Sequence, residues 1–147
     1  MKKINFISVI IFILTLANLA RAEVNIPLKK YLDENDIEVA STQIYLLKRC
    51  SGVYAYASGV VLKSDAVSSK NFIEISNNLL FKSVELMVID ENKKLEEAQK
   101  EAEKNRKEIF NIYINDGKKN WEKNKSHFKG SYISEDMSIC SKLTEEN

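Results

Sequence analysis

The chain has 147 residues, of which 44% are hydrophobic and 29% charged, a composition typical of one soluble globular domain and not of a disordered chain. Its formal net charge is +1, and 19 basic residues face 21 acidic ones once Lys2, Lys3 and Arg21 near the N-terminus are set aside. A balance so close to neutrality argues against nucleic acid or an anionic membrane as the main partner. One Pro and four Gly are too few breakers for a sheet protein, so we predict an all-α fold.

The N-terminus has the three parts of a secretory signal peptide. Two lysines follow Met1, and residues 4–16 form an uncharged apolar run. This run is shorter than the about 20 apolar residues that a membrane-spanning helix requires. Ala20 and Ala22 are the small residues that a signal peptidase reads, so we expect cleavage before Glu23.

The predicted location of the protein follows from that cleavage. Residues 1–22 are the expected signal peptide, and residues 23–147 form a single helical domain. We expect this domain to be periplasmic or secreted, with no membrane attachment after cleavage. An uncleaved N-terminal anchor is the alternative.

The first predicted helix covers roughly residues 35–63, after an extended segment over 23–32. Asn35 followed three residues later by Glu38 resembles a capping box, and apolar residues then recur at spacings of three, four and seven up to Val61. The helix should therefore present one continuous face to the core.

The second half of this helix, residues 50–62, is apolar or small on nearly every face, which predicts the most buried element of the fold. Gly52, Ala55 and Gly59 form a stripe of small residues along one side. Since each glycine costs about 1 kcal/mol of helix propensity, the stripe predicts the close approach of a neighbouring helix.

A long helical pattern follows over residues 70–114, with no breaker inside it. We favour one long, bent helix here, and a turn within 90–93 that divides it into two helices is the alternative. Asn115-Asp116-Gly117 indicates a turn. Two short helices should follow, over 118–129 and 134–144, which makes an antiparallel bundle of about four helices.

The last two predicted helices are short but have inward-facing residues. Trp121 and Phe128 lie seven residues apart and favour a core-facing stripe on the helix over 118–129. Ser134 is the expected N-cap of the final helix. Met137 and Cys140 then face inward, together with Leu143.

The chain has two cysteines, Cys50 and Cys140, and both lie on predicted inner faces. In an exported protein such a pair predicts a structural disulfide. For the long loop that it closes, the chain-entropy model gives a stabilisation on the order of 4–5 kcal/mol. A pair of buried free thiols is the alternative. Redox catalysis would require a motif such as C-x-x-C, which the sequence does not contain.

The two cysteine neighbourhoods carry a resemblance. Residues 49–54 (Arg-Cys-Ser-Gly-Val-Tyr) and the spaced set Ile133, Asp136, Cys140 and Leu143 resemble a pattern in small secreted helical proteins of alphaproteobacteria and their phages. The resemblance covers these two segments and leaves the polar middle of the chain unmatched. It implies the disulfide and a helical fold, and it implies no activity.

Residues with the chemistry of a cofactor site are few. His127 is the only histidine, so one chain can form neither a multi-histidine metal site nor a Ser-His-Asp triad. A haem iron could take His127 with Met87 or Met137 as its second ligand, although covalent attachment is excluded by the absence of C-x-x-C-H. We expect His127 to be a partly exposed polar residue instead, and predict no cofactor and no metal.

Charged groups give no better case for catalysis. The neighbouring carboxylates, such as Glu135 and Asp136, sit in charged runs or at helix starts and not in an apolar pocket that would raise a pKa. The small hydroxyl residues of the first helix are best explained as positions that let helices approach; they are Ser41, Ser51 and Ser58. Five lysines surround Trp121 and Phe128, and we interpret them as a solvated face; they are Lys118, Lys119, Lys123, Lys125 and Lys129.

The sequence therefore favours a non-enzymatic exported helical domain that contacts another exported protein or binds a hydrophobic client. A small-ligand or haem-binding bundle is the competing hypothesis. The charged stretch over 90–108 is either a solvated helix face or an arm that pairs with another chain.

Overall fold

The computed structural model describes residues 26–145, and within this range the chain is all-α, as predicted, with no strand. The described residues form five helices, where about four were expected. The predicted signal peptide and its cleavage site before Glu23 lie outside the described residues. The helices are α2 (Leu28–Glu34), α3 (Ala40–Val61), α4 (Ala66–Ile89), α5 (Leu95–Asn124) and α6 (Tyr132–Glu145).

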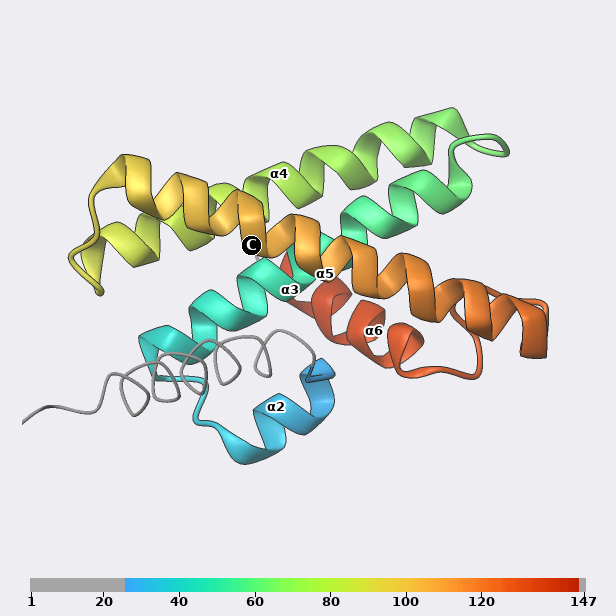
Figure 1. Cartoon of the computed structure of the whole chain (residues 1–147), viewed down its shortest axis with the longest axis horizontal. Helices are drawn as coiled ribbons and strands as arrows, with labels where there is room; N and C mark the ends of the chain where they lie inside the picture. The colour runs from blue at the N-terminus through green and yellow to red at the C-terminus, as the bar shows by residue number, and fades with distance from the viewer. Residues whose placement is uncertain (1–25, 146–147) are drawn as a thin grey trace, which may run out of the picture.

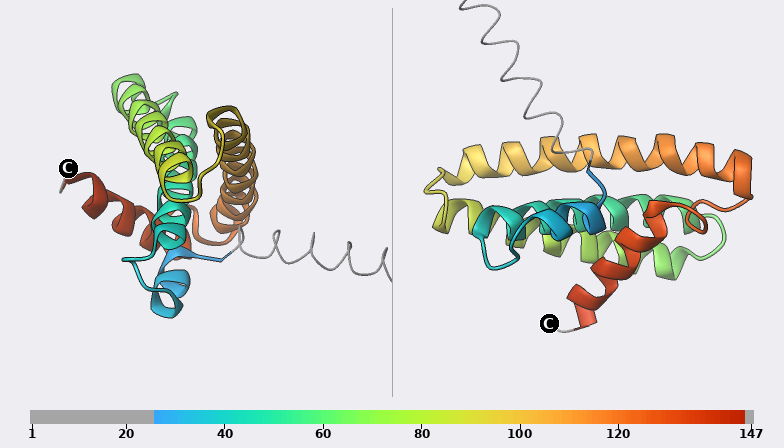
Figure 2. Two further views of the ribbon diagram at one scale, coloured as in Figure 1. Left: turned by 90° about the vertical axis from the view of Figure 1, so that its left-hand side faces the viewer. Right: turned by 90° about the horizontal axis from the view of Figure 1, so that it is seen from below.

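Helix α3 is the centre of the fold, because it contacts each of the other four described helices. The long helices α4 and α5 pack along it, and α6 crosses it at a steep angle (Figures 1 and 2). Every residue from Cys50 to Ser58 except Ala55 is buried. This confirms the prediction that the second half of the first long helix is the most buried element. Because the side chains on every face of this segment are apolar or small, neighbouring helices can pack against all of its faces.

The segment before α3 is helical, so the expected extended segment over 23–32 is wrong from residue 28 onwards. Pro27 is the N-cap of α2, a position that does not require its missing N–H group. Leu28 is fully buried, and its amide donates to Asp136 Oδ1 at 2.8 Å. Tertiary contacts of this kind stabilise a helix of seven residues that would be marginal alone.

The start of α3 lies at Ala40 and not at residue 35. The expected capping box does not form, because the Asn35 side chain donates to the carbonyl of Tyr31 (2.8 Å) and closes α2. Ile37, expected on the core face, is 42% exposed. Asn35 therefore ends α2. Helix α3 begins about one turn after Ile37, the first residue of the predicted apolar face.

The preferred single helix over 70–114 is wrong, and the alternative of a turn is confirmed. The chain reverses between Ile89 and Leu95, where Asn92 has a φ of 54° and the Lys93 amide donates to the carbonyl of Met87 at 3.2 Å. No Gly or Pro is present in this turn. The reversal buries a second apolar cluster that joins α3, α4 and α5; its members are Ile44, Val84, Met87, Ala98 and Ala102. Burial of this cluster stabilises the turn, and the cluster could not form in a continuous helix.

The predicted turn at 115–117 and the separate helix over 118–129 are also wrong, because α5 continues through Gly117 to Asn124. Gly117 is buried inside the helix, and a Cβ atom there would overlap the Tyr56 hydroxyl. This glycine thus permits a close helix contact. The final helix begins at Tyr132, and Ser134 donates its hydroxyl to the carbonyl of Ser131 and is not the N-cap.

The predicted disulfide between Cys50 and Cys140 is present and closes a loop with a sequence separation of 90 residues. Both cysteines are fully buried in the main core. The bond joins the middle of α3 to α6 and therefore holds the short last helix against the central one.

Candidate functional site

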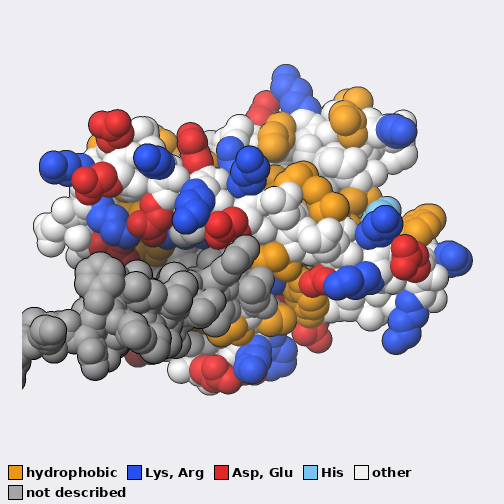
Figure 3. Space-filling model, viewed as in Figure 1, with side chains coloured by type: hydrophobic (Ala, Val, Ile, Leu, Met, Phe, Trp, Pro, Cys, Tyr) orange, Lys and Arg blue, Asp and Glu red, His pale blue; other side chains and the backbone are white. Residues whose placement is uncertain are grey.

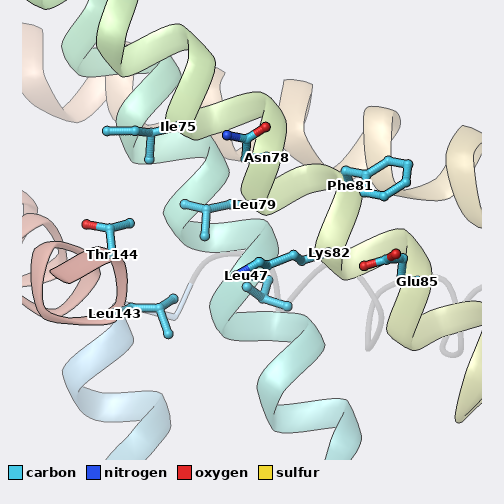
Figure 4. A pocket seen from close by; sticks show the side chains of 9 residues that line it. All are labelled: Leu47, Ile75, Asn78, Leu79, Phe81, Lys82, Glu85, Leu143 and Thr144. Atoms are coloured by element: carbon cyan, nitrogen blue, oxygen red, sulfur yellow. The ribbon is translucent and has the colours of Figure 1, made fainter. Parts of the chain in front are cut away.

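A groove lies at the junction of α3, α4 and α6. Its volume is about 490 Å³. Leu47 lies at its base on α3, while α4 and α6 form its two walls (Figure 4). The α4 wall consists of Ile75, Asn78, Leu79, Phe81, Lys82 and Glu85, and the α6 wall of Leu143 and Thr144.

The groove has an apolar floor and an exposed aromatic residue on its rim. Leu47 and Leu79 are only 8% and 5% exposed and are part of the main core. Phe81 is 60% exposed, although a phenylalanine gains most when it is buried. Lys82 and Glu85 follow it on the same helix and carry opposite charges. The groove thus presents apolar area with no excess of either charge.

The wall formed by α6 is held in place by three kinds of contact. The disulfide joins Cys140 to α3, and the hydroxyls of Tyr54 and Thr144 form a hydrogen bond of 3.2 Å near the end of α6. Asp136, one turn before Cys140, is fully buried and anchors the start of the helix. Together these contacts hold α6, and with it one wall of the groove, against α3.

Asp136 is the centre of a buried polar cluster. Its Oδ2 accepts from Arg49 Nε at 3.1 Å and from the Tyr113 hydroxyl at 2.6 Å, and its Oδ1 accepts from the Leu28 amide at 2.8 Å. All of these residues are fully buried. One carboxylate thereby connects α2, α3, α5 and α6.

The Arg49 guanidinium also lies over two aromatic rings, at 4.7 Å from the centre of Tyr113 and 5.6 Å from that of Tyr132. Burial opposes its charge, but the neighbouring Tyr113 and Asp136 raise the pKa of Arg49 above its ordinary value. Burial likewise raises the pKa of Tyr113 and of Tyr132, so both hydroxyls keep their protons. The cluster is a charge-neutral structural joint.

Sequence reasoning missed this cluster. Arg49 was considered as a neighbour of Cys50, and Asp136 was interpreted as a carboxylate in a charged run or at a helix start. One signal could have revealed it: Asp136 lies four residues before Cys140, on the face of α6 predicted to point inward. A carboxylate on an inward face requires a buried partner, and Arg49 is adjacent to the other cysteine.

The structure places His127 far from Met87. His127 Nδ1 is 3.0 Å from the Tyr56 hydroxyl, and its ring stacks on Trp121 with 5.0 Å between centroids. Met87 lies in the second apolar cluster beside Ile44, twelve residues before Tyr56 on α3. At about 1.5 Å per residue these two places are roughly 18 Å apart. His127 and Met87 therefore do not form one site.

The remaining candidate residues lie partly in the core and partly on the surface. Met137 packs half-buried against the main core. Among residues 26–145, no group of three or more His, Cys, Asp or Glu side chains could hold a metal ion. The interpretation of Trp121 as core-facing is wrong, because its side chain is 47% exposed, whereas Phe128 packs half-buried against the core.

The two glycines of the predicted small-residue stripe have different surroundings. Gly52 is buried under Ile109 of α5, as the predicted close approach requires, whereas a Cβ atom on Gly59 would meet nothing within 4 Å. Ser51 and Ser58 donate to carbonyls of α4, at 2.8 and 2.9 Å, in agreement with their interpretation as contact positions. Ser41 is exposed and has no such role.

Neither a protein-family model, nor a curated protein, nor a solved structure matches this chain. No helix within residues 26–145 has the length and apolar character needed to cross a membrane.

Proposed function

We propose that this protein is a non-enzymatic, exported interaction module that binds the apolar face of a client helix in the groove between α3, α4 and α6. The observation that carries the proposal is the position of Phe81, which is exposed on the rim above an apolar floor. Exposed aromatic residues beside apolar grooves are typical of binding surfaces. The client is another protein of the periplasm or of the extracellular space.

A helix is the occupant that best suits the shape and chemistry of the groove. Amphipathic helices bind grooves of this kind through apolar residues at spacings of three, four and seven. The groove is lined by residues of three helices, and its volume is within the range of binding sites. Lys82 and Glu85 on the rim allow charged residues of either sign beside the apolar face of the client.

The disulfide has a direct role in this proposal. Leu143 and Thr144 form one wall of the groove, and they follow Cys140 by about one further turn of α6. Without the bond, the short helix would lose its covalent attachment to α3. Because disulfides persist outside the cytoplasm, an intact groove agrees with the predicted export of the chain.

The proposal is tested with a fluorescein-labelled amphipathic helical peptide that has leucines at positions i, i+3, i+4 and i+7. Binding is measured by fluorescence anisotropy, and a peptide of the same composition without this periodicity is the negative control. Phe81→Ala should weaken binding about tenfold or more, since a buried aromatic anchor contributes more than 1.4 kcal/mol. Val67→Ala, at a 72% exposed apolar residue of the same helix outside the groove, should leave it unchanged.

The control on folding is simple, because Phe81 and Val67 are both exposed and their truncation should leave the circular dichroism and the unfolding midpoint unchanged. The double variant Cys50→Ser/Cys140→Ser should also weaken binding. Equal affinity of the two peptides, or equal effects of Phe81→Ala and Val67→Ala, would refute the proposal.

A further inference from the structure

A second hollow lies between α3 and α5, away from the groove described above. It is lined by Tyr56, Gly59, Val60, Phe110, Ile114 and His127 and has a volume of about 350 Å³. Gly59 is exposed, and a Cβ atom added to it would meet no atom within 4 Å. Ile114 beside it is 40% exposed. The hollow therefore has room for an aliphatic side chain from outside.

One side of this hollow is a rigid aromatic wall. His127 is held by its hydrogen bond with the Tyr56 hydroxyl and by stacking on Trp121. Burial raises the pKa of Tyr56 to about 12, so its hydroxyl keeps its proton. Trp121 stacks on His127 and still keeps 47% of its surface exposed. An exposed tryptophan beside an apolar hollow is a common anchor of protein interfaces.

The end of the molecule around this hollow is basic. In Figure 3 the pale-blue side chain of His127, the only histidine, lies among hydrophobic and basic side chains at the right-hand end. Of the five surrounding lysines, only Lys119 forms an ion pair within residues 26–145, with Asp116. The other four are exposed and have no ion pair with the described residues; they are Lys118, Lys123, Lys125 and Lys129. A partner with carboxylates around an aliphatic residue would complement this surface.

The opposite end of the molecule has that chemistry. The turn between α4 and α5 is flanked by Ile89 and Leu95, which are 69% and 57% exposed. Around them lie Asp90, Glu96 and Glu97, all exposed and outside the ion pairs of the described chain. We call the stretch 89–97 the acidic tip, because its four carboxylates outnumber its two lysines, of which Lys93 is ion-paired with Glu91 and Glu101. The carboxylates at the start of α5 are explained in part by the helix dipole, which favours negative charge at a helix N-terminus. The dipole does not explain why the apolar side chains of Ile89 and Leu95 are exposed.

The hollow and the acidic tip cannot meet within one molecule. Both lie along α5, and Trp121 follows Leu95 by 26 residues of this helix, which is about 39 Å at 1.5 Å per residue. Figure 1 shows the α4–α5 turn and the end of α5 at opposite ends of the molecule. Contact between the two surfaces requires a second copy of the chain.

We propose that copies of this protein associate head to tail, with Ile89 and Leu95 of one copy inserted beside Gly59 and Trp121 of the next. The lysines around the hollow face the carboxylates of the tip. Such a contact joins two different surfaces, so it leaves one of each free and continues into a ring or an open chain of copies. This inference is independent of the groove proposed to bind the client, because no residue that lines the groove belongs to the hollow or to the acidic tip.

The decisive experiment is a complementation test by sedimentation velocity. The purified protein should increase in mass with concentration, and the increase should disappear when the ionic strength rises from about 0.05 M to about 1 M, where charges are screened. Gly59→Phe, which fills the hollow, and Ile89→Lys, which charges the tip, should each abolish association. An equimolar mixture of these two variants should form one heterodimer and nothing larger, because each retains the surface that the other lacks.

Two controls test whether the variants are folded and whether their effects are specific to the two surfaces. Circular dichroism should show that both variants are folded, and Ile114→Glu at the rim of the hollow replaces Gly59→Phe if that variant is not. Val67→Lys, at an exposed residue outside both surfaces, should associate like the unchanged protein. A monomer at all concentrations, or association that persists in each single variant, would overturn the inference. Peptide binding in the groove would be unaffected by either result.

Discussion

The buried Arg49–Asp136 pair offers the sharpest test of how this fold is held together. In the variant Asp136→Ala, the guanidinium of Arg49 would stay in the core without its carboxylate partner. Breaking a fully buried ion pair from one side costs about 3–5 kcal/mol. The Tyr113 hydroxyl and the Leu28 amide would lose their acceptor as well. We therefore expect the free energy of unfolding to fall by at least about 3 kcal/mol, a large part of a typical domain's stability.

The assay is a double-mutant cycle with Arg49→Met, which replaces the charge by an apolar side chain of similar length. Unfolding by guanidinium chloride is followed by far-ultraviolet circular dichroism and by the fluorescence of Trp121, the only tryptophan. The double variant should be more stable than the sum of the two single losses predicts, by about 1–3 kcal/mol, since neither charge is then left alone. Asp136→Asn, which keeps one acceptor oxygen, should lie between Asp136→Ala and the unchanged protein.

Two results would refute this reasoning. If Asp136→Ala lowered the free energy of unfolding by less than about 1 kcal/mol, the pair would not be the buried joint that the structure shows. If the losses of the single variants were additive, Arg49 and Asp136 would stabilise the fold separately and not through each other.

Two further predictions concern helix contacts and pH. Gly52→Ala should lower the free energy of unfolding by about 1–3 kcal/mol because its Cβ atom would overlap Ile109, whereas Gly59→Ala should raise it by about 1 kcal/mol, and equal shifts in the denaturation midpoint would contradict this. Burial alone would raise the pKa of Glu101, but hydrogen bonds from Lys93 at 2.6 Å and Lys48 at 3.0 Å outweigh it and lower this pKa below 4.5. The stabilisation by Glu101 is thus present above pH 4.5 and is lost as the pH falls through the lowered pKa. Glu101→Gln should lower the melting temperature at pH 7 and not at pH 2, and an equal loss at both would contradict the assignment.

The glycines show why local patterns could not predict the helix ends. In sequence, Gly117 after Asn115-Asp116 has the composition of a turn, yet in the structure it lies mid-helix beneath Tyr56. Conversely, the stretch around Asn92 contains no breaker and still reverses the chain. In both places the gain from burying a side chain against another helix exceeds the local preference, which amounts to about 1 kcal/mol for a glycine.

The candidate groove was foreseen only in part. Cys140 and Leu143 were predicted to face inward from their spacing along α6, and the α4 wall was predicted as part of a long helical pattern. Their convergence on Leu47, with Phe81 exposed above them, depends on the crossing of α6 over α3. No spacing within one helix encodes that crossing.

The sequence by itself determined the helical class, the central position of the segment after Cys50, and the pairing of the two cysteines. The first two follow from composition and from periods within single helices, which neighbouring residues set, and the third follows from the presence of only two cysteines in a chain expected to be exported. Only the tertiary structure decided where the long helical pattern reverses, which face of α5 leaves Trp121 exposed, and that Asp136 neutralises Arg49. Each of these depends on residues that are distant in the chain, because the free energy of burial depends on which surfaces meet.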